Sequence, residues 1–172
     1  MIQEQVIVVD ENDVVLGSME KMEAHRNPVL HRAISVFIVN SEGEWLLQQR
    51  ALGKYHSNGL WTNTCCSHPQ PGESSLDAAN RRLAEEMGLK AELTEKFHFI
   101  YREPLDNDLT EYELDHVFVG VSNQVPNINT NEVLSYKYIA YDDLKKDIET
   151  NPDNYTVWFL KIVDRVNQYL KK

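Results

Sequence analysis

A helix with strong signals at both ends, between Ser74 and Gly88, is the feature that most constrains how this chain folds. Before it, the run Pro69-Gln70-Pro71-Gly72 breaks regular structure, and Ser74 can cap the helix with Asp77 three residues on, as in a capping box. Gly88 then provides a typical helix end. Apolar residues recur in between at helical spacing, at Leu76, Ala79, Leu83 and Met87. The pattern predicts an amphipathic helix that must lay one face on a neighbouring element.

Strand-like segments lie on both sides of this helix in the sequence. Apolar runs bounded by turn residues predict strands at 5–9, 14–16, 33–39, 45–50, 61–66, 96–101, 111–122 and 133–141, with a polar loop at 51–59. Short helices are expected at 19–24 and from Asp142. A last helix carries one apolar stripe, formed by Tyr155, Trp158, Phe159, Ile162, Val163, Val166, Tyr169 and Leu170. Mixed strands with few helices predict an α/β (α+β) fold, with a mixed sheet sandwiched between helices in one domain over residues 1–172.

The formal net charge of −10 limits the partners that this chain can have. It argues against a nucleic-acid binder, which needs a basic surface, and it means that an anionic substrate would require a local cluster of cations. No apolar run approaches the roughly 20 residues of a membrane helix, so we expect no membrane partner. The first residues lack the pattern of a signal peptide. We therefore expect a cytoplasmic protein, as a monomer or weak dimer.

The two cysteines, Cys65 and Cys66, are adjacent. Neighbouring residues on a strand point to opposite faces, so these two make a poor disulfide pair and fit a reducing compartment. By the same rule Cys66 and His68 share one face, and Cys65 points to the other.

Histidine and glutamate residues suggest a metal site. Glu111 and Glu113 are two apart on a predicted strand, so both side chains face one way, and the turn at Asn27-Pro28 can bring His25 and His31 toward one point. Three imidazoles and two carboxylates suit Zn²⁺, Mn²⁺ or Fe²⁺ better than a site made only of oxygens does. Taken alone, the two glutamates also fit a solvated strand face. The remaining histidines, His56, His98 and His116, are interpreted as surface groups or helix caps.

The segment from Ser67 to Leu89 resembles a Nudix box. That box is a loop and helix with the pattern Gly-x5-Glu-x7-Arg-Glu-U-x-Glu-Glu-x-Gly-U, in which U is a bulky apolar residue. Aligned on Gly88, the matching residues are Glu73, Arg81, Leu83, Glu85, Glu86, Gly88 and Leu89. Ser67 replaces the first glycine and Arg82 replaces a carboxylate. Exchanging a metal-binding carboxylate for a phosphate-binding cation weakens the case for hydrolysis. The alternative interpretation is a charged, solvent-exposed helix with no catalytic role.

Four short pieces resemble the type I isopentenyl-diphosphate isomerases when taken together and in order. They are Glu20-Lys21-x3-His25, Leu30-His31, Trp61-Thr62-Asn63-x-x-Cys66-x-His68-Pro69 and Glu111-x-Glu113, and Arg50-Ala51-Leu52-x-Lys54 adds a further match. The resemblance implies a Nudix-like fold. It also implies an enzyme that interconverts isopentenyl diphosphate and dimethylallyl diphosphate by protonation and deprotonation, through a tertiary carbocation-like species.

The same resemblance assigns roles to individual residues. It implies that one Mn²⁺ or Zn²⁺ ion is ligated by His25, His31, His68, Glu111 and Glu113, and that Glu86 helps to hold Mg²⁺ on the substrate diphosphate. It assigns the acid–base pair to Cys66 and Glu113, with Tyr101 relaying or orienting the proton. Basic positions that bind the diphosphate are Lys21, Arg50, Lys54 and Arg82. Trp158 is the candidate platform for the cation, although a tryptophan on the apolar stripe of a helix is usually a core residue.

Two other functions fit parts of the sequence. The Nudix box also fits a hydrolase that cleaves a nucleoside or other diphosphate, but Arg82 and the pair Cys66 and Glu113 argue against it. A non-catalytic relative that binds a metal or a diphosphate is the third possibility, and the presence of every expected catalytic residue argues against that.

Overall fold

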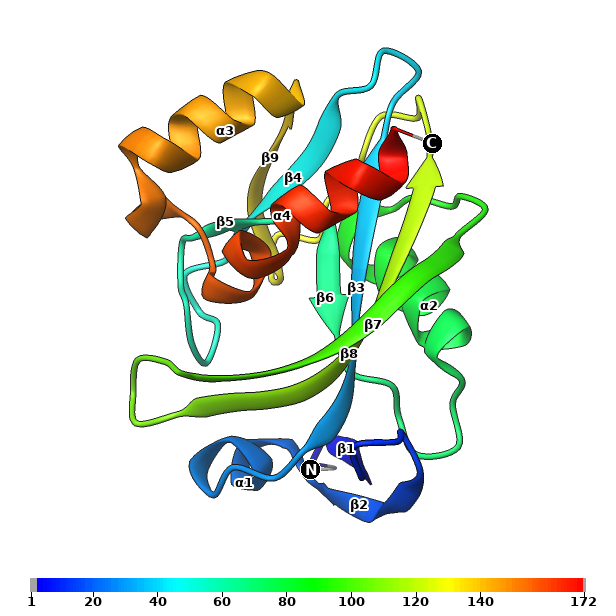
Figure 1. Cartoon of the computed structure of the whole chain (residues 1–172), viewed down its shortest axis with the longest axis vertical. Coiled ribbons are helices and arrows are strands. Elements are labelled where there is room, and N and C mark those ends of the chain that lie inside the picture. Colours follow the sequence, from blue (N-terminus) through cyan, green and yellow to red (C-terminus); the bar gives the residue numbers. More distant parts are fainter. Residues whose placement is uncertain (1–2, 172) are drawn as a thin grey trace.

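Strand β3 (His31–Val39) lies at the centre of the sheet in the computed structural model, which describes residues 3–171 (Figure 1). Along one edge it runs parallel to β8 (Thr110–Val121), with His31 opposite Glu113. Its other edge is shared in turn by β1 (Gln5–Val9), β6 (Cys65–Ser67) and β4 (Trp45–Arg50). Each of these three strands pairs with only a few residues of β3.

The remaining strands extend the sheet on both sides of this centre. On the β8 side, β7 (Thr94–Pro104) pairs antiparallel with β8; on the edge of β3 that carries β1, β2 (Val15–Glu20) pairs with β1. Strand β4 in turn carries both β5 (Trp61–Thr62) and β9 (Val133–Ile139). The helices are α1 (Lys21–Arg26), α2 (Ser75–Met87), α3 (Tyr141–Thr150) and α4 (Val157–Leu170), with a 3₁₀ turn, η1, at Pro152–Asn154. None of the helices among residues 3–171 is both long and apolar enough to cross a membrane.

Helices cover both faces of the sheet, as the sequence predicts. In Figure 1, α4 lies in front of the sheet and α2 behind it. Alternate residues of β3 serve the two cores: Ile34, Val36 and Ile38 pack with α2, whereas Phe37 and Val39 pack with α4. On β8 the same alternation places Val117 on the α4 face. Glu111, Glu113 and Asp115 precede it at intervals of two, so these carboxylates also lie on the α4 face.

The helix predicted between Ser74 and Gly88 is present as α2, but the set of residues that it buries differs from the prediction. The backbone N–H of Asp77 donates to the Ser74 hydroxyl at 3.1 Å, so the expected cap is present. Gly88 ends the helix in the left-handed region at φ 63°, and a Cβ there would lie 2.5 Å from the carbonyl oxygen of Asn127, so glycine is required. Leu76, expected in the core, is 43% exposed, and Ala78 is buried instead.

Two other predicted elements have different bounds. Met19 and Glu20, expected in a helix, belong to β2, because the β1–β2 pairing continues to the Gln5–Glu20 pair. The single strand expected at 61–66 is two short strands, separated at Asn63 and Thr64. The Thr64 hydroxyl accepts from the N–H of Ile38 at 2.8 Å and donates to the carbonyl of Leu46 at 2.7 Å. The Thr64 side chain therefore bridges the backbones of β3 and β4.

Candidate active site

Five side chains from four separate parts of the chain converge on one point. Each offers one nitrogen or oxygen atom, and these atoms all lie within 4.8 Å of one another. They come from α1, from the start of β3, from the residue after β6 and from β8, and they are His25, His31, His68, Glu111 and Glu113. The cluster contains every residue that the sequence assigned to the first metal site. Four of the five are buried, and His68 is partly buried.

The hydrogen bonds of two histidines indicate which ring nitrogen faces the cluster. Nδ1 of His25 lies 2.7 Å from the carbonyl oxygen of Lys21, and Nδ1 of His31 lies 2.8 Å from that of Val29. A carbonyl only accepts, so we assign the ring hydrogen to Nδ1 in both. Each Nε2 then turns a lone pair toward a carboxylate oxygen, at 3.4 Å from Glu111 for His25 and 3.1 Å from Glu113 for His31. A proton or a cation must lie between each pair.

A divalent metal ion fits this arrangement. Among residues 3–171, the buried atoms that lack a hydrogen-bond partner include Nε2 of His25 and Oε2 of Glu111, which face each other. Nε2 of His68 adds a third imidazole, 2.6 Å from Oε2 of Glu113. Imidazole nitrogens fixed through their other nitrogen, together with carboxylates, are the ligand set of Zn²⁺, Mn²⁺ or Fe²⁺. One ion would satisfy all five groups at once.

A cavity of about 300 Å³ opens beside the cluster on the α4 face of the sheet. All the proposed acid–base and cation-stabilising residues line it, as do all four proposed diphosphate-binding residues: Cys66, Tyr101, Glu113, Trp158, Lys21, Arg50, Lys54 and Arg82. His68 and Glu111 connect the cavity to the metal cluster. The structure therefore brings together residues that are up to 137 positions apart in the sequence.

Cys66 lies on the cavity side of β6, and Cys65 lies on the α2 side, as the alternation rule predicts. The side chain of Asn63 fixes this segment by donating to the carbonyls of Val36 at 3.1 Å and Cys65 at 2.8 Å. Burial raises the pKa of the Cys66 thiol to about 12, an effect that the charge of Arg50 opposes. The thiol is therefore protonated at neutral pH.

Glu113 is held between the histidines and Tyr101. Tyr101 stands directly opposite Glu113 in the β7–β8 pairing, and its hydroxyl donates to Oε1 of Glu113 at 2.5 Å. Burial by itself would raise the pKa of the Glu113 carboxyl. The charge of His68, and the hydrogen bonds that His31 and His68 donate when their rings are protonated, outweigh burial and hold that pKa well below its usual range. Burial raises the pKa of Tyr101, and the nearby negative charge of Glu113 raises it further.

Trp158 belongs both to the core and to the cavity wall, so the two interpretations from sequence are compatible. The start of α4 is tied to β5, because the N–H of Thr156 donates to the carbonyl of Trp61 at 3.0 Å and the Thr156 and Thr62 hydroxyls are 2.8 Å apart. This anchor sets the indole against the cavity. The guanidinium carbon of Arg50 lies 5.3 Å from the ring centroid of Trp158.

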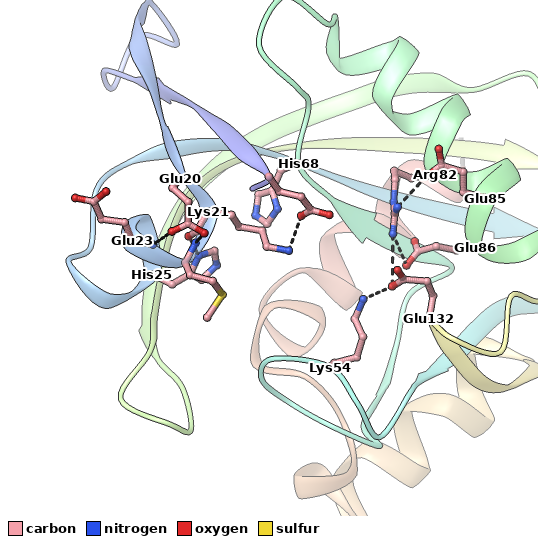
Figure 2. Close-up of polar contacts among 12 residues, drawn as sticks. Glu20, Lys21, Glu23, His25, Lys54, His68, Arg82, Glu85, Glu86 and Glu132 are labelled. Atoms are coloured by element: carbon pink, nitrogen blue, oxygen red, sulfur yellow. Dashed lines mark hydrogen bonds and ion pairs between the residues drawn. The ribbon is translucent and has the colours of Figure 1, made fainter. Parts of the chain in front are cut away.

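Figure 2 shows Lys21 on one side of the site and a second group, Lys54 with Arg82, on the other, and carboxylates pair with all three. Lys21 lies 2.5 Å from Glu4. Lys54 pairs with Glu132, and Arg82 contacts Glu132 at 3.6 Å.

Glu86 lies beside this second group and outside the five-residue cluster. One of its oxygens is 3.3 Å from Arg82. The other is buried and has no hydrogen-bond partner within the described residues. Glu86 therefore has one unpaired carboxylate oxygen beside Arg82, although it is not among the described residues that line the cavity.

Two buried groups at the site were not expected from the sequence. His56, interpreted as a surface group, is 1% exposed and lies 2.9 Å from Glu111, because residues of the 51–59 loop line the cavity. Asp115 lines the cavity and accepts from the Ser35 hydroxyl at 2.6 Å. Its spacing of two from Glu113 was the signal that could have identified it. His116 is also buried, between Asp13 and Glu95, whereas His98 is exposed as expected.

Comparison with known proteins adds sequence relatives of nearly the same length. The model of the NUDIX domain family matches residues 29–159. An isopentenyl-diphosphate Delta-isomerase of Pectobacterium atrosepticum is 53% identical over 165 residues, which cover 96% of this chain and 92% of that protein. Isopentenyl-diphosphate Delta-isomerase 2 of Aromatoleum aromaticum is 48% identical over 164 residues, covering 95% of this chain and 87% of that protein.

Solved structures share the architecture at low sequence identity. DR0079 from Deinococcus radiodurans superposes with a TM-score of 0.78 at 20% identity, covering 94% of this chain and 98% of that one. The MutT protein from Methanosarcina mazei Go1 gives 0.67 at 19% identity, over 83% and 96% of the two chains. At such identities the likeness concerns the fold alone, and it confirms the expected Nudix-like α+β arrangement.

Proposed function

This chain belongs to the NUDIX family and, within it, to the isopentenyl-diphosphate Delta-isomerases, and on that premise we propose that it interconverts isopentenyl diphosphate and dimethylallyl diphosphate by metal-dependent proton transfer. The observation that carries the proposal is the shared cavity. Cys66, Glu113 and Trp158 line it together with four basic residues, and Glu113 also belongs to the metal cluster. The cavity thus offers two proton-transfer groups and an aromatic face to a hydrocarbon chain, and cations to a diphosphate.

The proton balance of the reaction requires two groups. One proton adds to the terminal methylene carbon of isopentenyl diphosphate, and the alkene electrons form the new C–H bond and leave a tertiary cation. Another proton then leaves the neighbouring methylene carbon, and its C–H electrons form the new double bond. Each turnover therefore exchanges the protonation states of the donor and the acceptor, which must return to their starting states through solvent.

Cys66 and Glu113 suit these two tasks. The Cys66 thiol has a pKa of about 12 because it is buried, so it begins as a proton carrier. The Glu113 carboxyl has its pKa held below the usual range, so it begins as an acceptor. Tyr101, which donates to Glu113 at 2.5 Å, orients that carboxylate and can relay its proton.

Two ions would complete the site. His25, His31, His68, Glu111 and Glu113 would hold Mn²⁺ or Zn²⁺, and Glu86 would help to hold Mg²⁺ on the diphosphate. When bound, such ions neutralise phosphate charge and favour the ionised form of a carboxylate. Lys21, Arg50, Lys54 and Arg82 supply the local positive charge that a protein of net charge −10 needs to bind an anion. The diphosphate would displace Glu132 from Lys54 and Glu4 from Lys21.

Proton NMR of isopentenyl diphosphate in D₂O tests the function directly. With purified protein, Mg²⁺ and trace Mn²⁺ or Zn²⁺, we expect dimethylallyl diphosphate that carries deuterium, because the acid–base pair exchanges with solvent. Activity should disappear when a chelator removes the metal and return when the metal is restored. An unchanged spectrum with every metal, together with cleavage of a nucleoside diphosphate derivative, would instead support a hydrolase.

The role of Trp158 predicts unequal effects for two substitutions. An indole face can stabilise a desolvated cation by about 2 kcal/mol, which is roughly a thirtyfold effect on rate. We expect Trp158→Phe to keep more activity than Trp158→Ala, because phenylalanine retains an aromatic face. The measurement is kcat for both variants, with thermal unfolding to confirm that each is folded. Near-wild-type rates in both variants would remove Trp158 from the mechanism.

We also propose a cytoplasmic location and a small assembly. Both cysteines are free thiols, which suits a reducing compartment. All the proposed site residues come from one chain, so a monomer or weak dimer is sufficient for activity.

A further inference from the structure

His56 connects three parts of the site without belonging to the metal cluster. It lies in the loop between β4 and β5 and is 1% exposed. Among the described residues, the group of converging ligand atoms does not include it. Burying a polar ring without a partner costs free energy, so the contacts that His56 makes must compensate for its burial.

The first contact of His56 is with Glu111. Nε2 of His56 lies 2.9 Å from Oε1 of Glu111, while the other oxygen, Oε2, faces Nε2 of His25 at 3.4 Å. On the far side of the ring, Nδ1 lies 3.0 Å from the hydroxyl of Ser57, which can donate to it. The ring hydrogen then belongs on Nε2, which lies at ion-pair distance from the carboxylate although its N–H does not meet hydrogen-bond geometry there. His56 thus engages one oxygen of Glu111 and leaves the other for the cluster.

The second and third contacts are with Trp158 and Arg50, which also line the cavity. The ring of His56 meets the ring of Trp158 edge to face, at 5.6 Å and 84°. The backbone carbonyl of His56 accepts a hydrogen bond from Arg50 at 3.1 Å, and Arg50 lies over the Trp158 ring. One residue therefore touches a metal ligand, the candidate cation platform and a candidate diphosphate-binding cation.

We propose that His56 is a positioning residue, which selects the oxygen that Glu111 presents to the metal and sets the indole of Trp158 against the cavity. The inference rests on the proposed function, since it assigns a task to His56 within that same site. The N–H orients the carboxylate of Glu111, and the ring packs against the indole of Trp158. These two tasks can be separated by substitution.

Two variants divide the tasks. His56→Phe keeps a ring against Trp158 and removes the N–H that faces Glu111. His56→Gln keeps an amide N–H of similar reach and removes the ring. His98→Phe is the matched control, because His98 is exposed on β7 and packs only against His116 among the described aromatic rings.

The first readout is metal affinity, measured on the purified full chain by competition for Zn²⁺ or Mn²⁺ with a chromogenic chelator. We expect His56→Phe to bind the metal about 10- to 100-fold more weakly, which is the usual loss when a group that orients a ligand is removed. His56→Gln and His98→Phe should bind as the wild type does. Wild-type affinity in His56→Phe would overturn the inference.

The second readout is the division between kcat and KM at saturating metal. We expect His56→Gln to lower kcat with little change in KM, because the indole is less well placed while the diphosphate contacts remain. A purely structural residue would instead lower the melting temperature in both variants and leave metal affinity and kcat unchanged. Failure of the wild-type protein to bind any divalent ion would overturn the metal site and this inference with it. Metal binding by the wild type with no loss in His56→Phe would overturn the inference alone.

Discussion

We expect Cys66→Ala to lower kcat by about 100- to 10,000-fold, the range for loss of a positioned acid or base. The Cys66 thiol lines the cavity, and burial raises its pKa to about 12, so it carries a proton at neutral pH. Alanine has no proton to give and is smaller, so it does not obstruct the cavity. The rate of dimethylallyl diphosphate formation by NMR, with KM and metal affinity measured beside it, separates lost chemistry from lost binding.

Cys65→Ala is the matched control for this prediction. Cys65 is the adjacent residue with the same side chain, but it packs in the core beneath α2, on the other face of the sheet. Its removal should cost about 1 kcal/mol of stability through the small space left behind, with turnover near the wild-type rate. Full activity in Cys66→Ala would rule out the proposed acid–base pair.

Glu113→Gln should have an effect at least as large, because Glu113 serves as both a base and a metal ligand. We expect kcat at saturating metal to fall by about 100- to 10,000-fold. Metal affinity should also fall, since Oε2 of Glu113 is the atom nearest to both His31 and His68. A glutamine amide keeps the size of the side chain and can still meet the Tyr101 hydroxyl. It cannot accept a proton from carbon.

Glu111→Gln distinguishes the two roles of Glu113. Glu111 belongs to the same cluster and the same strand face, but it does not contact Tyr101 through any hydrogen bond in residues 3–171. We expect Glu111→Gln to weaken metal binding yet recover most of its kcat when excess metal is supplied. Equal and unrecoverable losses in both variants would mean that Glu113 acts only as a ligand.

Local patterns in the sequence determined several features of this protein. The alternation of strand residues correctly placed Glu111 with Glu113 and separated Cys65 from Cys66, because side chains on a strand alternate between faces. The signals at Ser74 and Gly88 gave the bounds of α2, because caps depend on a few adjacent residues. The family resemblance supplied the fold and the function. That residues 1–172 act as one domain stays a prediction.

Tertiary structure alone decided how these pieces meet. His31 faces Glu113 because β3 and β8 are parallel neighbours, a register that no local pattern specifies. His56 was misread because a polar loop has no periodicity, and its burial depends on the fold of the 51–59 segment over the cavity. The pairing of Arg82 with Glu132 likewise joins residues from distant segments. Strand periodicity determines the face of the sheet on which a side chain lies, whereas long-range packing determines which residues that side chain contacts.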